Sequence, residues 1–432
     1  MQLKENLKKV YTKEYLILIG IGFLPLLWKI LEIVFLSGFV NALKILAQMV
    51  LISIIFKVFE ESILNPLYKI LSKNEDSNAN NYLIKKFLII YSIITLIFSA
   101  VCFFASSSIL KISQVSTYIF DETLIFLKIY IVSCGFGVIS KYLYTCSLIS
   151  KETKKLFVYL LIKSVATAML FLLFVPKFTL KMGVNGIALS ELIINIATII
   201  YLSTNLVKTY KTKLDFNKKE YFKLFALAFF ETLIRNAVYY CVILVFLNLI
   251  DNQDLYFVAN EYIWSIMLVP ALAQSTLIRQ QVTNKNNNLK PFFLNSLFLF
   301  AFIIILIPLA LFIFKYIYNL QNYLDYFIVL LKLIPCYFIF IIDSIIESYF
   351  IASGKLHHVL IQSILTNIVV YLTAFILYLC NVISISLNLI IILFNIGVIV
   401  SSLYTICVYL VLMKRNKSSH CNFDITTYFL NK

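Results

Sequence analysis

Charged residues are scarce in this chain of 432 residues. They occupy 13% of the positions, whereas hydrophobic residues occupy 61%. A soluble globular domain is about one-quarter charged and about half apolar, so the composition excludes that class. The apolar runs reach about 20 residues or more, which is the length that crosses the hydrocarbon core of a bilayer. The sequence therefore predicts an all-α protein that crosses a membrane many times.

Catalytic and metal-binding motifs are also absent. No Walker loop, dinucleotide-binding glycine pattern or G-x-S-x-G motif occurs, which excludes an ATP-driven pump for this chain alone. The eight cysteines include no C-x-x-C pair, so neither a disulfide framework nor a cysteine metal site is indicated. The three histidines, His357, His358 and His420, have no metal-binding partners at a usable spacing. We therefore expect that the chain is not an enzyme.

Twelve transmembrane spans are predicted, and short polar connections join them. The longest cytoplasmic connection leaves six spans on each side, so both halves share one orientation, as in transporters whose halves are related by an axis along the membrane normal. We expect an N-terminal lobe at 1–207, a linker at 208–220, a C-terminal lobe at 221–412 and a cytoplasmic tail at 413–432. The expected spans lie near 15–39, 43–67, 84–107, 122–147, 156–176, 183–207, 221–248, 254–280, 291–317, 325–350, 356–380 and 385–412.

Basic residues predict how the chain is oriented. Lys and Arg gather in every second connection and at both termini, and the opposite connections hold only Lys44, Lys111, Lys177, Lys181 and Lys315. The positive-inside rule then predicts that both termini lie in the cytoplasm. We expect the protein in the cytoplasmic membrane. The formal net charge of +16 thus reflects membrane topology and does not indicate nucleic-acid binding. The basic residues also give the protein some affinity for anionic lipid.

Acidic residues inside the spans are the main chemical signal, because a charge at the centre of a span costs about 2.5–3.5 kcal/mol on insertion scales. Asp343 and Glu347 lie four residues apart in one predicted span. Their carboxylates repel each other unless a cation joins them or one is protonated. Glu261 lies early in the predicted span at 254–280. Together with Glu231, these residues are candidates for binding Na⁺ or a proton.

Two acid–base pairs allow two interpretations. Glu231 and Arg235 are four residues apart, and Lys29 and Glu32 are three apart, so each pair lies on one helical face. Such a pair can neutralise itself, which lowers the cost of burial without any role in transport. It can equally belong to a functional site, and both interpretations stay open.

Several segments carry a likeness to a known family. "LPLLWKILEIVFLSGFVNALKILAQ" near the N-terminus has Glu32 where the family has an acidic residue, usually Asp. "GVNGIALSELI" (183–193) is similar to a Gly-x-x-Gly-x-Ala opening of span 6, and "FFETLIRN" places Glu231 in span 7. Asp343 falls in span 10, where the family has an aspartate. On these features the chain resembles the multidrug and toxic compound extrusion (MATE) transporters, in a superfamily that also holds polysaccharide-lipid flippases.

The resemblance implies a cation site and a mechanism. Glu231 and Asp343 would couple the entry of Na⁺ or H⁺ to the exit of a small organic compound, with Glu261 and Glu347 assisting. Glu32, with Lys29, would mark a proton or substrate site in the N-terminal lobe. We expect alternating access by a monomer that exports an organic cation and needs no cofactor other than the coupling ion.

The chain also departs from the family. It has only nine glycines, so larger residues fill several glycine positions. Arg235 and Lys29 place a positive charge beside a proposed carboxylate, which either neutralises the cation site or signals an anionic substrate. The flippase branch holds lipid pyrophosphate with basic cavity residues, so the alternative is a flippase for a lipid-linked oligosaccharide. The bases that would serve it are Lys29, Lys128, Lys163, Arg235 and Lys332.

Overall fold

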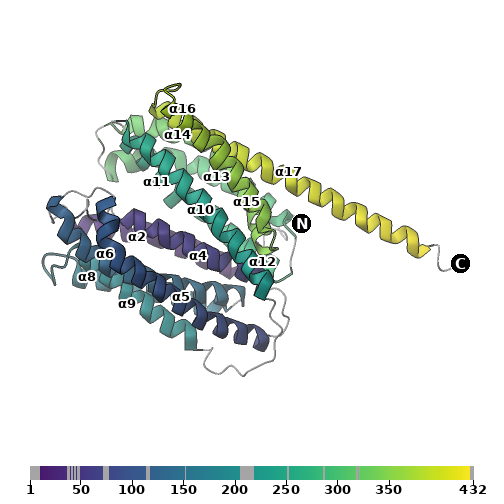
Figure 1. Cartoon of the computed structure of the whole chain (residues 1–432), viewed down its shortest axis with the longest axis horizontal. Coiled ribbons are helices and arrows are strands. Elements are labelled where there is room, and N and C mark those ends of the chain that lie inside the picture. The colour runs from purple at the N-terminus through teal and green to yellow at the C-terminus, as the bar shows by residue number, and fades with distance from the viewer. Residues whose placement is uncertain are drawn as a thin grey trace. The chain divides into compact units, whose positions relative to one another are not determined.

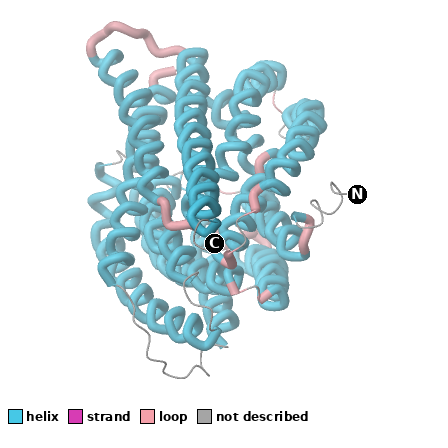
Figure 2. The backbone as a smooth tube through the Cα atoms, turned by 90° about the vertical axis from the view of Figure 1, so that its right-hand side faces the viewer, coloured by secondary structure: helices cyan, strands magenta, loops and turns pink. Residues whose placement is uncertain are grey.

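The computed structural model consists of helices joined by loops in the part of the chain that it describes, with no strand among those residues (Figure 2). The described residues are 10–36, 39, 42, 45, 49–71, 77–112, 117–150, 152–204, 218–250, 253–285, 288–317, 320 and 322–428. Some side chains within these ranges, including those of 24–34, 237–241 and 415–428, lie outside the description. The all-α prediction is confirmed.

The chain divides into two compact units (Figure 1). The first contains Met1–Phe229 and Arg279–Asn287, and the second contains Phe230–Ile278 and Asn288–Lys432. Most of the predicted linker at 208–220 lies outside the described residues, which end at 204 and resume at 218. The helices that lie wholly in the first unit are α2 (Lys13–Leu36), α4 (Met49–Leu71), α5 (Ser77–Ile112), η1 (Thr117–Ile119), α6 (Phe120–Ile149), α7 (Thr153–Leu161), η2 (Ile162–Ala166), α8 (Thr167–Phe174) and α9 (Val184–Ser203).

The second unit begins inside a helix. α10 (Lys218–Asn248) enters this unit at Phe230, and α12 (Val269–Thr283) leaves it after Ile278. The predicted tail at 413–432 begins as a continuation of the last helix. The remaining elements are α11 (Gln253–Tyr262), η4 (Ile263–Met267), α13 (Lys290–Phe312), η5 (Ile313–Ile317), α14 (Tyr323–Ala352), α15 (Leu356–Ile364), η6 (Leu365–Leu372), α16 (Thr373–Leu379) and α17 (Leu387–Tyr428).

Eight helical segments of the described chain are long and apolar enough to cross a membrane. Their outer faces carry large apolar side chains, such as Phe104 at 83% exposure and Ile305 at 70%, which lipid tails can cover. The chain is therefore a multi-pass membrane protein. The eight segments are Tyr82–Lys111, Thr117–Ile149, Leu156–Phe174, Val184–Ser203, Lys290–Ile317, Tyr323–Ala352, Leu356–Leu379 and Leu387–Lys414.

The other four predicted spans are helices outside this set of eight. They correspond to α2, α4, α10 and the run from α11 to α12. α2 and α10 contain side chains outside the described residues, at 24–34 and 237–241, and the set of eight covers described residues only. Twelve spans in two six-helix lobes therefore stay a prediction.

Small and neutral polar residues join neighbouring helices in the first unit. Between α6 and α9, the Ser140 hydroxyl donates to Asn195 Oδ1 at 3.3 Å, and Asn195 Nδ2 donates to the Ser133 carbonyl oxygen at 3.2 Å. Side-chain hydrogen bonds and close backbone approach are what hold helices together in lipid, where no hydrophobic drive acts between them.

The Gly-x-x-Gly segment at the start of α9 has a structural reason for both glycines. Gly183 adopts a φ of 54°, a left-handed backbone conformation that side chains disfavour. Gly186 lies so close to Phe174 of the preceding segment that an added Cβ would lie 2.9 Å from its backbone carbonyl. The two glycines therefore permit the turn into α9 and its close packing on α8.

Three helical runs of the second unit contain π-helical turns. η4 lies between α11 and α12, η5 follows α13, and η6 lies between α15 and α16. π turns interrupt the regular helical ladder and occur frequently at functional sites. The turn η6 begins two residues after Ser363, where the polar side chains of the candidate site gather.

Candidate functional site

Glu231 on α10 is a buried carboxylate with a positive charge on its own helix. Its side chain is only 4% exposed, and Arg235 Nε lies 2.8 Å from its Oε1. The spacing of four residues places the two side chains one above the other on the helix, so the contact is local. The Thr232 hydroxyl donates to the second oxygen, Oε2, at 3.0 Å. Arg235 is more open, with 41% of its side chain exposed.

Asp343 on α14 is equally buried but has a different environment. Its Oδ2 accepts hydrogen bonds from Gln362 Nε2 at 3.1 Å and from the Ser401 hydroxyl at 3.3 Å. Gln362 Nε2 also donates to Ser401 Oγ at 2.6 Å, so these three side chains form one cluster. Among the described residues, Asp343 Oδ1 has no hydrogen-bond partner.

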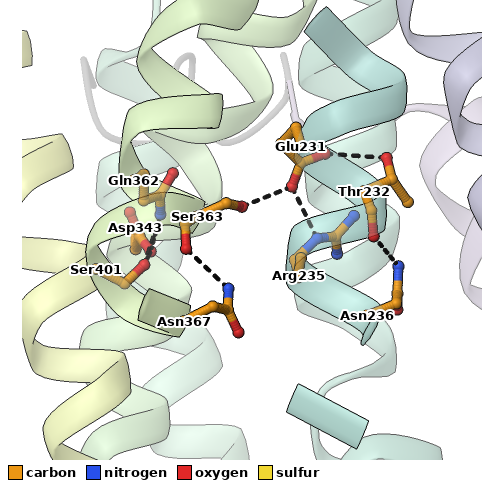
Figure 3. A network of polar contacts seen from close by, with 9 residues as sticks. All are labelled: Glu231, Thr232, Arg235, Asn236, Asp343, Gln362, Ser363, Asn367 and Ser401. Atoms are coloured by element: carbon orange, nitrogen blue, oxygen red, sulfur yellow. Dashed lines mark hydrogen bonds and ion pairs between the residues drawn. The ribbon is translucent and has the colours of Figure 1, made fainter. Parts of the chain in front are cut away.

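Adjacent residues of α15 connect the two carboxylates (Figure 3). Gln362 contacts Asp343, while the hydroxyl of Ser363 donates to Glu231 Oε1 at 2.9 Å. Asn367, one turn further along, donates to the carbonyl oxygen of Ser363 at 2.9 Å. Four helical runs thus contribute to one polar network: α10, α14, α15 with η6, and α17. All of its residues lie in the second compact unit.

The other two predicted acids of this lobe lie outside the network drawn in Figure 3. Glu347 is half-buried one turn after Asp343 on α14, and its charge acts on that carboxylate. Glu261 is half-buried on α11 and accepts a hydrogen bond from the Ser265 hydroxyl at 2.8 Å. Whether either assists a cation site stays a prediction.

Lys29 and Glu32 lie on α2, but their side chains are outside the described residues. Their predicted role in an N-terminal proton or substrate site therefore stays a prediction.

The other bases of the flippase alternative have different surroundings. In the first unit, Lys128 Nζ lies 5.4 Å from the centroid of the Phe103 ring, and Lys163 Nζ lies 3.3 Å from the Tyr159 hydroxyl. In the second unit, the exposed Lys332 donates to Asn388 Oδ1 at 2.8 Å. Whether these bases serve a flippase stays a prediction.

Sequence reasoning missed the neutral partners of the two acids. Gln362, Ser363 and Ser401 lie in long apolar runs, and Gln362 and Ser363 are buried. A neutral polar side chain in a span also needs a partner, because lipid offers none. The polar pair "QS" at 362–363 was therefore a signal in the sequence, although it does not say which carboxylate each residue contacts.

Comparisons with solved structures identify the fold. A MATE transporter from Vibrio cholerae, VcmN, aligns with a TM-score of 0.77 and 14% identity over 96% of this chain and 98% of its own. A multidrug-resistance MATE transporter of the MOP superfamily in an outward-facing conformation aligns with a TM-score of 0.78 and 13% identity over 95% and 97%. A MOP-superfamily transporter from Pyrococcus furiosus aligns with a TM-score of 0.74 and 13% identity over 92% and 94%.

Sequence comparison adds nothing to this likeness. No protein-family model and no curated protein sequence matches the chain. The identities to the solved structures are low, so the likeness establishes the fold over nearly the whole chain and leaves activity to be argued from the site.

Proposed function

We propose that this chain, which has the fold of the MATE transporters, is a secondary active transporter that exports small organic cations in exchange for Na⁺ or H⁺. It works as a monomer, by alternating access between two lobes of six spans each, at 1–207 and 221–412. It lies in the cytoplasmic membrane with both termini in the cytoplasm, uses no cofactor beyond the coupling ion, and is not an enzyme. The near-complete alignment with MATE structures supports the two-lobed arrangement.

The observation that carries the proposal is the state of Asp343. This carboxylate is 3% exposed, has one oxygen without a hydrogen-bond partner in the described chain, and faces the charge of Glu347 on the next turn. A buried carboxylate without a counter-charge is costly, so the protein gains free energy when a proton or Na⁺ neutralises it. Glu347 increases that gain, because two nearby negative charges both favour a bound cation.

Binding at Asp343 can change the contacts of α15. Hydrogen bonds to an ionised acceptor are roughly twice as strong as those between neutral groups. A cation at Asp343 therefore weakens the bonds from Gln362 and Ser401, which join α14 to α15 and α17. A ligand shifts a conformational equilibrium only when it binds the two states with different affinity. These bonds supply such a difference, and α15 is the element that responds.

The test is transport by the full-length protein in liposomes. An imposed Na⁺ or pH gradient should drive ethidium, a fluorescent organic cation, against its own gradient. Asp343→Asn should abolish this coupling. Asp325→Asn is the matched control, because Asp325 is an exposed acid at the start of the same helix, α14, and this variant should keep coupling. Unchanged coupling in Asp343→Asn would show that Asp343 is not the coupling carboxylate.

A flippase for a lipid-linked oligosaccharide is the second candidate, and the bases inside the spans favour it. Arg235 has 41% of its side chain exposed in the middle of α10, the predicted span at 221–248, where a base can meet an anionic headgroup. The neighbour from Pyrococcus furiosus is described as having a binding pocket of reverse polarity that suggests a different function. Charge reversal at Arg235 and Lys128 should then abolish glycan export in cells that depend on this protein. Normal export by that variant would count against the flippase.

A further inference from the structure

The two carboxylates of the site differ in whether they already hold a positive charge. Glu231 forms an ion pair with Arg235 at 2.8 Å. Its two oxygens also accept hydrogen bonds, Oε1 from Ser363 and Oε2 from Thr232. A buried carboxylate with an ion pair and donors on both oxygens is neutralised within the protein, so it gains little from a cation taken from water.

Asp343 has no such partner in the described part of the chain. No basic side chain there lies within ion-pair distance of it, and the nearest described charge on its own helix is that of Glu347. The neutral donors Gln362 and Ser401 bond to its Oδ2, and the hydroxyls of Ser402 and Thr405 on α17 also lie near the carboxylate. Its Oδ1 is buried without a partner, as is the hydroxyl of Ser402, the residue that follows Ser401 on α17.

We propose that Arg235 is a built-in cation of this site, which occupies Glu231 permanently and leaves Asp343 as the carboxylate of this polar network that exchanges a coupling cation. The inference rests on the proposed cation-coupled transport and makes it more specific. The guanidinium supplies at Glu231 the charge that a second Na⁺ or H⁺ would otherwise supply. Arg235 thereby sets the number of cations that the site binds.

The local geometry explains why this cation stays in place. Arginine keeps its charge at any physiological pH, and its rigid planar head is suited to a carboxylate partner. The spacing of four residues on one helix means that the pair does not depend on how α10 is positioned against other helices. A movement of α15 can therefore break the contact between Ser363 and Glu231 while the ion pair persists.

The experiment counts cations bound by the full-length protein in detergent. Radioactive Na⁺ is used at neutral pH, and proton uptake on acidification is titrated in parallel. The wild type should bind a cation that Asp343→Asn loses and Glu231→Gln keeps. Arg235→Gln should bind one further cation, which is about twice the wild-type amount of Na⁺ or one proton more on acidification, because Glu231 then needs a counter-charge from solution. Arg235→Lys should behave as the wild type, since the ammonium restores the charge.

The double variant Glu231→Gln with Arg235→Gln is the critical control. It removes both charges together, so it should bind the same amount as the wild type, and it tests the inference even where Arg235→Gln alone does not fold. Equal binding by the wild type and folded Arg235→Gln would overturn the inference, as would loss of the cation in Glu231→Gln. If Asp343→Asn binds as much as the wild type, the proposed coupling site fails, which is a separate result.

Discussion

Ser363 and Glu231 are 132 residues apart in the sequence, yet the Ser363 hydroxyl donates to Glu231 Oε1 at 2.9 Å. This bond joins α15 to α10. Gln362, the preceding residue, bonds to Asp343 on α14. One dipeptide of α15 therefore contacts both carboxylates of the candidate site, and changes at these two positions separate the roles of the two acids.

Ser363→Ala should lower the stability of the protein by a modest amount. Side-chain hydrogen bonds inside membrane proteins contribute about 0.6 kcal/mol on average and up to about 1.7 kcal/mol. We expect the upper part of this range, because Ser363 contacts a carboxylate. Thermal unfolding in detergent measures the loss.

The control for this change is Ser296→Ala. Ser296 is also buried, but its hydroxyl donates within its own helix to the carbonyl oxygen of Phe293. Its removal should have a smaller effect, because the carbonyl oxygen of Phe293 lies within α13 and keeps its backbone hydrogen bond when the serine hydroxyl is lost. Equal losses at Ser363 and Ser296 would show that the contact with Glu231 contributes nothing specific.

Contacts between residues of one helix can be predicted from their spacing in the sequence, whereas contacts between helices cannot. The ion pair between Glu231 and Arg235 follows from their spacing of four residues on any helix. The membrane class follows from composition and from the length of the apolar runs. Neither inference needs to know which helices are neighbours.

The partners of Asp343 could not be predicted in the same way. Gln362 and Ser401 come from two other helices, 19 and 58 residues further along the chain. Many serines and asparagines in these apolar runs have the same chemistry, and most of them, such as Ser344, bond back to their own helix. Only the packing of α14 against α15 and α17 selects the residues that reach Asp343.

Gly186→Ala should destabilise the first unit. The new Cβ would lie 2.9 Å from the backbone carbonyl carbon and oxygen of Phe174, and backbone atoms cannot move aside cheaply. Overpacking of this kind costs about 1–3 kcal/mol. A lower unfolding temperature in detergent would report it.

Gly137→Ala is the matched change on α6. Its Cβ would meet the amide nitrogen of the Asn195 side chain at 3.3 Å, and a side chain can shift by a few tenths of an ångström. We therefore expect a smaller loss than at Gly186. A larger loss at Gly137 would contradict this account of α9 packing.

Gln280→Ala should weaken the C-terminal end of α6. Gln280 is 2% exposed, and its side chain donates to the carbonyl oxygen of Leu148 at 2.6 Å. The last carbonyl groups of a helix have no partner within the helix. The backbone N–H of Ser150 also reaches the Leu148 carbonyl, so the variant removes a second donor, which contributes about 0.5–1.5 kcal/mol. Hydrogen exchange at the end of α6 should rise in this variant.

Asn284→Ala provides the comparison for that prediction. Asn284 donates to the neighbouring carbonyl oxygen of Ile149 at 3.1 Å, but it is exposed. Water or a headgroup can replace an exposed donor, so exchange should rise less than in Gln280→Ala. The reverse order would show that burial does not decide the cost at this helix end.

Gln362→Met should lower the concentration of the driving cation that gives half-maximal transport. The amide of Gln362 competes with a cation for Oδ2 of Asp343, and methionine fills a similar volume without a donor. Loss of about 0.6–1.7 kcal/mol of competing interaction corresponds to about a threefold to twentyfold decrease. Ethidium transport in liposomes across a series of Na⁺ or proton gradients measures it. Asn295→Leu is the control, since this buried amide of the same compact unit donates to Gln274 Oε1 at 2.6 Å and lies outside the polar network. It should leave the cation requirement unchanged. An increased requirement in Gln362→Met would mean that the amide oxygen serves as a ligand of the cation, and the competition argument would be wrong.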